Sequence, residues 1–312
     1  MKKLLTATAL SLVCSTAMAQ DIGVAMAQFD NNFLTIVRGG IEEKAAELGV
    51  HLQFEDAQND ITRQMDQLRN FVSSGVDAII LVAVDSDAIA QMDKIANEAG
   101  IPIVNVNREP PHIESLGPLE AFVGSKETDA GTIQASAACD LVRDAKGGAP
   151  ATGVILAGDL FIQAGRVRTQ MVQDYVKTPD CDFVTIEDMQ VADWSRTKAN
   201  DLVINWLSSG MKPDVIFANN DEMAIGAAQA IKSAGVDPDS IVIAGIDATP
   251  DALSAMETGD IDLTVFQDAR GQGAKSVEIA VAMAQGETLE DRAVYIPFEL
   301  VTPDNIQNYS TE

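Results

Sequence analysis

The sequence predicts an α/β protein of two lobes, each built on a parallel β-sheet with helices on both faces. Apolar, β-branched runs recur along the chain, and amphipathic segments of helical period separate them. The runs are continuous rather than alternating, as in Ala78–Val82, which is typical of strands that are covered on both faces. This alternation of strands and helices indicates βαβ units with right-handed crossovers. It occurs once before about Gly124 and once after it, which predicts two similar lobes. With 312 residues, the chain also exceeds what a single core usually fills.

The first 19 residues have the pattern of a secretory signal peptide. The chain opens Met1-Lys2-Lys3, runs apolar to Val13 and reaches Ala17-Met18-Ala19. A basic start, a short apolar run and an A-x-A site together indicate export, and the run is too short for a spanning anchor. We therefore expect a mature protein that begins near Gln20 and works in the periplasm.

The predicted strands form two series. The first series is Ile22–Ala27, His51–Glu55, Ala78–Val84, Ile103–Asn107 and Ala121–Val123. The second series is Gly153–Ala157, Phe183–Glu187, Val215–Ala218, Ile241–Ile246 and Leu263–Phe266. Apolar residues three or four positions apart predict helices over 33–48, 61–72 and 89–99, with Gly49, Gly75 and Gly100 at their C-terminal ends. No low-complexity linker divides the two series, so we expect short crossings between the lobes.

The chain is strongly acidic, with 47 Asp and Glu against 21 Lys and Arg. A net charge of −26 opposes binding to nucleic acid or anionic lipid, and it favours a soluble monomer. Cys14 falls in the predicted signal peptide, where Val13 departs from the small residue that precedes a lipidated cysteine.

Cys139 and Cys181 remain after export, and an oxidising compartment permits a disulfide between them. The alternative is one buried thiol and one free thiol. Two isolated cysteines make no metal site, and His51 and His112 have no ligand-like spacing, so we expect neither a metal nor a cofactor.

Polar side chains follow six of the predicted strands. In open parallel sheets, ligands bind outside the carboxyl ends of the strands, which makes these residues the candidate site. With two aromatic residues that can stack on a ring, the candidates are Asn31, Phe33, Asn107, Arg108, Arg166, Trp194, Asn220, Asp247 and Gln267.

This set suits a polyhydroxylated ligand. Asn and Gln donate and accept hydrogen bonds, Asp accepts, and Arg donates in a fixed fork. The rings of Phe33 and Trp194 suit the apolar faces of a sugar. The competing structural roles are helix capping by Asn31, first-turn acids at Asp221 and Glu222, a turn at Asp247, an ion pair of Arg108 with Glu109, and a core position for Trp194.

Catalytic motifs are missing from the sequence. The first strand leads into no G-x-G-x-x-G loop, and neither a Walker A sequence nor a G-x-S-x-G elbow occurs. We therefore expect a binding protein and not an enzyme. An exported enzyme that acts on sugars stays open as an alternative, because the many acids can include the carboxylate pair that a glycosidase needs.

At these same residues, the chain resembles the ribose-binding-protein family of periplasmic sugar-binding proteins, over almost its whole mature length. The landmarks are Asn31-Asn32-Phe33, Asp85-Ser86-Asp87-Ala88, Ile101–Val104, Asn219–Ala224 and Gly245–Asp251. The resemblance implies the periplasmic binding protein type I fold: two Rossmann-like lobes, joined by three hinge crossings, that close around one sugar and deliver it to an ABC-type permease. It implies an N-terminal lobe of residues 20–124 and 268–293 and a C-terminal lobe of residues 125–267 and 294–312.

Carried over by position, the family's ligand residues fall on Asn31, Phe33, Arg108, Arg166, Trp194, Asn220, Asp247 and Gln267. The chain departs from ribose binders at Asn107, Leu34 and Val82, which argues against ribose itself. The run Val106–Pro110 resembles members that bind inositol or related cyclic polyols, so myo-inositol or a relative is the expected ligand, with pentoses, hexoses and linear polyols as alternatives.

Two further functions belong to the same fold. A sugar-responsive repressor would need an N-terminal helix-turn-helix, which residues 1–20 do not provide. A sugar receptor for chemotaxis without transport differs from a transport protein only in its partner, and it stays open.

Overall fold

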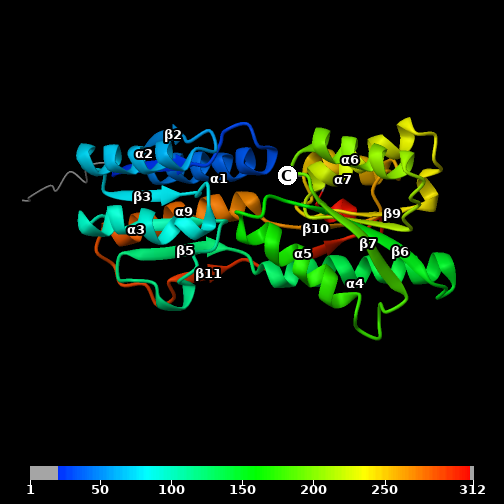
Figure 1. Ribbon diagram of the computed structural model, residues 1–312. Helices are drawn as coiled ribbons and strands as arrows, with labels where there is room; N and C mark the ends of the chain where they lie inside the picture. Colours follow the sequence, from blue (N-terminus) through cyan, green and yellow to red (C-terminus); the bar gives the residue numbers. More distant parts are fainter. Residues whose placement is uncertain (1–19, 310–312) are drawn as a thin grey trace, which may run out of the picture.

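Two parallel sheets with helices on both faces form the two halves of the molecule (Figure 1). The computed structural model describes residues 20–309, and the predicted signal peptide lies outside the described residues. The α/β fold of two lobes that the sequence predicts is confirmed. No helix among residues 20–309 has the length and apolar character needed to cross a membrane.

The first sheet has the strand order β11-β5-β4-β3-β1-β2, and every neighbouring pair is parallel. Its strands are β1 (Asp21–Met26), β2 (His51–Asp56), β3 (Ala78–Leu81), β4 (Ile103–Val106), β5 (Glu120–Gly124) and β11 (Ala293–Tyr295). One face packs on α1 (Asn32–Leu48) and α9 (Ala269–Ala284), and the other on α2 (Ile61–Ser74) and α3 (Ile89–Glu98). Burial on both faces explains why β3, β4 and β5 are enclosed along their whole length.

The second sheet has the parallel order β7-β6-β8-β9. Its strands are β6 (Ala151–Ala157), β7 (Val184–Val191), β8 (Val215–Ala218) and β9 (Val242–Ala244). Beyond β9, single parallel bridges lead to β10 (Thr264–Phe266), which pairs antiparallel with β12 (Glu299–Val301). The helices are α4 (Glu127–Lys146) and α5 (Gln163–Tyr175) on one face, and α6 (Arg196–Ser208), α7 (Asp221–Ser233) and α8 (Pro250–Glu257) on the other. Short 3-10 turns are η1 (Ser86–Ala88), η2 (Ile113–Ser115), η3 (Pro238–Ser240) and η4 (Ile306–Asn308).

The predicted helix ends agree with the structure. Asn31 caps α1 by accepting a hydrogen bond from the Leu34 backbone N–H at 3.0 Å. Gly49 and Gly75 end α1 and α2 in the left-handed region, with φ of 70° and 74°, which glycine adopts without a steric penalty.

The strand predictions differ from the structure mainly at sheet edges. β11 and β12 were not predicted, because they are short and only partly buried, whereas the equally short β9 and β10 lie in more apolar runs. β7 continues to Val191 and not only to Glu187, since this edge strand is largely accessible and its apolar pattern is weak. β3 ends at Leu81 and not at Val84, whose backbone N–H bonds to the Gln64 side chain.

The chain passes between the two sheets three times in the described part. The crossings run from β5 to α4, from β10 to α9 and from β11 to β12. In Figure 1, α9 (orange) accordingly lies among the blue and cyan elements of the first half. Since β11 pairs with β5, the third crossing follows Tyr295, whereas the predicted boundary after residue 293 divides this strand.

A disulfide joins Cys139 in α4 to Cys181, which precedes β7, with the two Cα atoms 5.7 Å apart. Of the two alternatives that the sequence left open, the structure has the paired one. Both cysteines belong to the core between α4, α5 and the second sheet.

Candidate functional site

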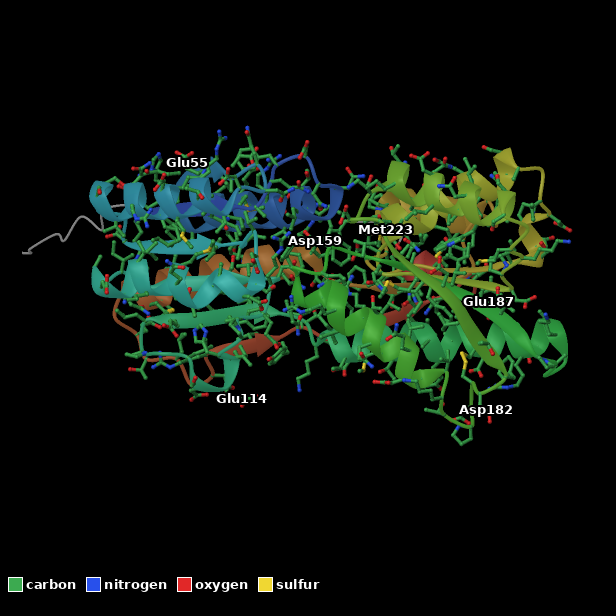
Figure 2. The ribbon with its side chains drawn as sticks, in the orientation of Figure 1. Glu55, Glu114, Asp159, Asp182, Glu187 and Met223 are labelled. Atoms are coloured by element: carbon green, nitrogen blue, oxygen red, sulfur yellow. A yellow bond between two sulfur atoms is a disulfide. The ribbon has the colours of Figure 1, made fainter. Side chains whose placement is uncertain are left out.

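A cavity between the lobes lies at the carboxyl ends of strands from both sheets. Its volume is about 430 Å³, counting the part open to solvent. Figure 2 shows Asp159, which follows β6 beside this cavity, between the two halves. Eight of the nine predicted site residues line the cavity together: Asn31, Phe33, Asn107, Arg108, Trp194, Asn220, Asp247 and Gln267.

Arg166 is the predicted residue that the structure places elsewhere. Its guanidinium donates to the Leu160 carbonyl at 2.6 Å and pairs with Asp87 at 3.0 Å, on the partly exposed side of α5. Arg168, two positions later, lines the cavity instead. The helical period explains the error, because the buried stripe of α5 is Gly165, Arg168, Thr169 and Val172.

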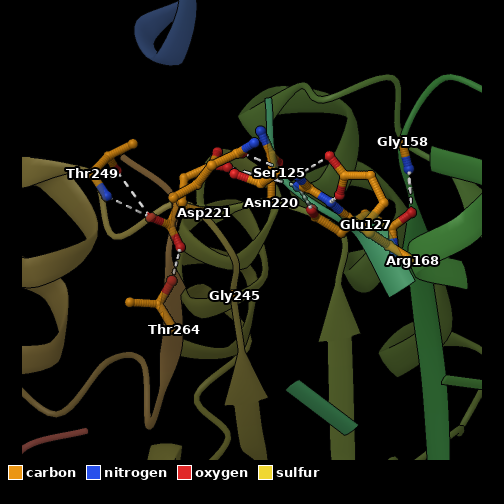
Figure 3. Close-up of polar contacts among 12 residues, drawn as sticks. Ser125, Glu127, Gly158, Arg168, Asn220, Asp221, Gly245, Thr249 and Thr264 are labelled. Atoms are coloured by element: carbon orange, nitrogen blue, oxygen red, sulfur yellow. Dashed lines mark hydrogen bonds and ion pairs between the residues drawn. The ribbon is translucent and has the colours of Figure 1, made fainter. Parts of the chain in front are cut away.

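Arg168 is the buried centre of the polar network in the second lobe. Its Nε and Nη2 atoms donate to both oxygens of Glu127, at 2.5 and 3.2 Å, in a bidentate pair (Figure 3). Nη2 also donates to Gln267 Oε1 at 3.1 Å, and Nη1 lies 3.7 Å from Asp247 Oδ1. Burial alone lowers the pKa of Arg168, but the charges of Glu127 and Asp247 outweigh it and raise the pKa. The guanidinium therefore stays charged and fixed in place.

Arg108 brings the second cation of the cavity, from the end of β4. Its Nη1 donates to the carbonyls of Ala83 and of Val84, the latter at 2.9 Å. Burial lowers the pKa of Arg108 to about 10, so it remains protonated at neutral pH. The ion pair of Arg108 with Glu109, which the sequence left open as an alternative, is not present, and Glu109 accepts hydrogen bonds from Tyr295 and Gln163.

Two neighbouring carboxyl groups, Asp221 and Asp247, lie on the second-lobe side of the cavity. Asp221 accepts hydrogen bonds from the Thr249 backbone at 2.7 Å and from the Thr264 hydroxyl at 2.6 Å (Figure 3). Burial raises the pKa of Asp221 to about 7. Burial also raises the pKa of Asp247 well above its usual range, although the charge of Arg168 opposes this effect. Only Asp247 of the two lines the cavity, so Asp221 is a supporting residue.

The two aromatic walls of the cavity come from different lobes. Phe33 is in the first turn of α1, and Trp194 precedes α6. The indole ring rests on Gly158, where an added Cβ would lie 2.2 Å from the ring. Gly158 therefore permits the position of Trp194.

Three of the cavity residues have left-handed backbone conformations. The φ angles are 66° at Asn107, 60° at Trp194 and 126° at Asp247. Such angles are unfavourable for residues other than glycine, and they persist where the surrounding structure enforces them, often at binding sites. Parallel bridging of Asp247 to Phe266 is one such constraint.

Gln267 carries a donor that no other described group satisfies. Its Oε1 accepts from Arg168, while its buried Nε2 has no hydrogen-bond partner among residues 20–309. Since buried polar groups are normally paired, this N–H₂ group is suited to a ligand oxygen. Together with two guanidinium groups, the amides of Asn31, Asn107 and Asn220 and the Asp247 carboxyl group, this donor lets the cavity bind several hydroxyl groups at once.

Four residues that line the cavity are not among the predicted site residues: Leu34, Ile162, Ala164 and Arg168. Leu34 was noted only as a departure from ribose binders, and Ile162 and Ala164 are apolar and have no chemical signal. Arg168 was detectable from the helical period of α5, as described above.

Direct contacts also join the two lobes beside the cavity. Asn32 donates to Glu222 at 2.7 Å, Ser86 Oγ accepts from the Gln163 backbone at 3.0 Å, and the Arg166–Asp87 pair lies nearby. We call these three pairs the cleft contacts. They join the two lobes directly.

Comparisons with known proteins bear on the family of the chain. The family model described as "Periplasmic binding protein domain" matches residues 22–288. A putative rhizopine-binding protein of Rhizobium meliloti is 49% identical over 311 residues, which covers 99% of both chains. A ribose import binding protein of Salmonella typhimurium is 30% identical, covering 93% of this chain and 95% of its own. Among solved structures, an ABC transporter solute binding protein from Bacillus halodurans with bound myo-inositol has a TM-score of 0.85 and 39% identity, covering 93% of this chain and 97% of its own.

Proposed function

The chain belongs to the family of periplasmic binding proteins, and from this premise we propose that it captures a cyclic polyol, with myo-inositol as the first candidate. The ligand would be held between the lobes in the periplasm, after export directed by residues 1–19, and passed to an ABC-type permease. The observation that carries the proposal is the cavity into which both lobes direct hydrogen-bonding groups beside two aromatic walls.

The polarity of the cavity supports a neutral, hydroxyl-rich ligand. Arg108 and Arg168 donate and Asp247 accepts, while the amides add the Nδ2 groups of Asn31 and Asn220 and the Nε2 group of Gln267 as donors and the Asn107 oxygen as an acceptor. A hydroxyl group is both donor and acceptor, and a wrong epimer would leave one of these buried groups unpaired. This requirement gives stereochemical selectivity without any reaction.

The departure from ribose binders at Asn107 supports a cyclic polyol over ribose. Its Nδ2 donates to Gln272 at 3.2 Å, which leaves its oxygen as the acceptor for a ligand. The solved relative at 39% identity holds myo-inositol, which supports the same class here. The proposed ligand set is the eight predicted residues that line the cavity, with Arg168 in place of Arg166.

The proposal is tested by thermal unfolding of the purified protein with inositols, pentoses, hexoses and linear polyols. A ligand at a hundred times its Kd is expected to raise the free energy of unfolding by about 2.7 kcal/mol. We expect myo-inositol or a close relative to give the largest shift, and NMR should recover the ligand unchanged. If no polyol shifts the melting temperature, the proposed ligand class is wrong, and if the ligand is converted, the protein is an enzyme.

Two substitutions test the assigned site. Trp194→Ala removes an aromatic wall, and Asp247→Ala removes a buried acceptor, so each is expected to weaken binding about ten- to a hundred-fold with the fold retained. Asp304→Ala, at an exposed position outside the cavity, is the control and should bind like the wild type. Calorimetry measures the affinities, and unchanged affinity in both site variants would contradict the assignment.

A further inference from the structure

A second cluster of ionisable side chains lies in the first lobe, outside the cavity between the lobes. Asp93 is on α3, Glu120 begins β5, and His112 is in the segment 107–119 that joins β4 to β5. One ligand atom from each lies within 4.8 Å of the other two. The side chains of Asp93 and Glu120 are 1% and 11% exposed and that of His112 is 24% exposed, so the cluster is buried with one accessible side.

The distances in this cluster fit a metal site. His112 Nε2 lies 3.3 Å from Asp93 Oδ2 and 3.3 Å from Glu120 Oε2. Nitrogen and oxygen ligands at the usual bond lengths of a tetrahedral zinc ion are about 3.3–3.5 Å apart. Two of the three pairs of ligand atoms therefore already have the spacing of corners of such a site, and the third pair lies within 4.8 Å.

The charges of the cluster are not balanced by side chains. Among the described residues, His112 is the only basic group within ion-pair distance of Asp93 or Glu120. Two buried carboxylates beside one imidazole need further positive charge or a proton.

Neighbouring groups orient the two carboxylates. Asn105 Nδ2 donates to both oxygens of Asp93, at 3.1 and 3.2 Å, and the Gly117 backbone donates to Glu120 Oε2 at 2.7 Å. Asn97 donates to the other oxygen of Glu120. Such outer hydrogen bonds fix the direction of metal-binding carboxylates.

Unpaired polar atoms at the cluster are an independent sign of a missing partner. Asn97 Oδ1, Asn105 Oδ1 and His112 Nδ1 are buried and have no hydrogen-bond partner within the described part of the chain. Asn105 is fully buried. Three such atoms around one cluster are unusual, and an ion with its bound water accounts for unpaired groups of this kind.

We propose that Asp93, His112 and Glu120 bind a divalent transition-metal cation, with Zn²⁺ as the best match. The imidazole favours Zn²⁺ over Ca²⁺ and Mg²⁺, which prefer oxygen ligands. The bound ion would fasten the segment 107–119 to α3 and β5. Asn107 and Arg108 begin this segment and line the cavity between the lobes, so the ion would also restrict the motion of these two residues.

Calorimetric titration of the purified protein with ZnCl₂ tests this site. The protein is prepared without a polyhistidine tag and is treated with a chelator beforehand. We expect one Zn²⁺ per chain and a higher melting temperature, with no comparable effect of CaCl₂ or MgCl₂. If Zn²⁺ neither binds stoichiometrically nor stabilises the wild type, the proposal is wrong and the cluster shares a proton instead.

The chain offers a matched control, since it has only two histidines. His112→Gln is expected to weaken Zn²⁺ binding more than ten-fold, whereas His51→Gln, at an exposed residue paired with Asp21, should bind like the wild type. Glu120→Gln, which keeps the side-chain shape, is a second variant in case His112→Gln does not fold. Equal Zn²⁺ affinity in His112→Gln and the wild type would overturn the assignment, whatever the ligand of the cleft proves to be.

Discussion

Two asparagines at the cavity have a structural role and a cavity-facing position at the same time. Asn31 Oδ1 caps α1 through the Leu34 N–H, and Asn220 Oδ1 caps α7 through the Met223 N–H, both at 3.0 Å. Both residues also line the cavity. Capping uses the amide oxygen and leaves the Nδ2 group as a donor, so capping and ligand binding are compatible for the same residue.

Also at the residue scale, Asp221 predicts a dependence of stability on pH. Its pKa is raised from 3.8 to about 7 by burial. A carboxyl group with a higher pKa in the folded state binds its proton more tightly there. Its stabilising contribution is therefore complete below about pH 3.8 and is lost as the pH rises through about 7.

We expect Asp221→Asn, which cannot ionise, to be less destabilising at about pH 8 than at about pH 5, relative to the wild type. Urea unfolding of both proteins at the two pH values measures this difference. Asp304→Asn, at an exposed residue, controls for the general loss of one carboxylate. A difference for Asp221→Asn that is the same at both pH values would contradict the assignment of the proton to this group.

At the scale of elements, α1 and α9 approach each other closely enough to require glycine. A Cβ on Gly40 would lie 2.2 Å from the Arg270 carbonyl oxygen, and one on Gly273 would lie 2.1 Å from the Val37 carbonyl oxygen. The two helices come from opposite ends of the chain, and together they cover one face of the first sheet. The close approach also fixes Phe33, in the first turn of α1, beside the second crossing.

Adjacent glycines in α1 give a matched pair of predictions. Gly40→Ala is expected to lower the free energy of unfolding by about 1–3 kcal/mol, because the backbone of α9 must move. Gly39→Ala meets no atom within 4 Å and should raise the free energy of unfolding by up to about 1 kcal/mol, since alanine favours the helix. Denaturant unfolding checks both variants, and equal effects would show that the helices do not depend on this contact.

At the scale of the whole molecule, the cleft contacts favour the state in which the lobes meet. Two of them, Asn32–Glu222 and the Arg166–Asp87 ion pair, join exposed side chains, and such contacts usually contribute less than about 1 kcal/mol each. A ligand that touches both lobes adds its own contacts to the same state. Affinity for the ligand should therefore include the contribution of the cleft contacts.

Removing a cleft contact should weaken ligand binding although no residue that lines the cavity is changed. Asn32→Ala and Asp87→Ala are each expected to raise the Kd of the best polyol about two- to five-fold, mainly through faster release. Calorimetry gives the Kd and stopped-flow fluorescence of the tryptophans gives the release rate, with Asp304→Ala as the control. Unchanged Kd in both variants would mean that these contacts are replaced in solution by equally good contacts with water.

Local patterns in the sequence decided the α/β class, the two lobes, the caps Gly49 and Gly75, and eight of the twelve residues that line the cavity. They sufficed because continuous apolar runs, helical period and strand ends are properties of neighbouring residues. The tertiary structure alone decided what depends on distant segments. It placed Arg168 and not Arg166 at the cavity, paired Cys139 with Cys181, and added β11 to the first sheet. It also brought His112, without any ligand-like spacing in the sequence, between Asp93 and Glu120, because α3, β5 and the segment between β4 and β5 meet only when the sheet is assembled.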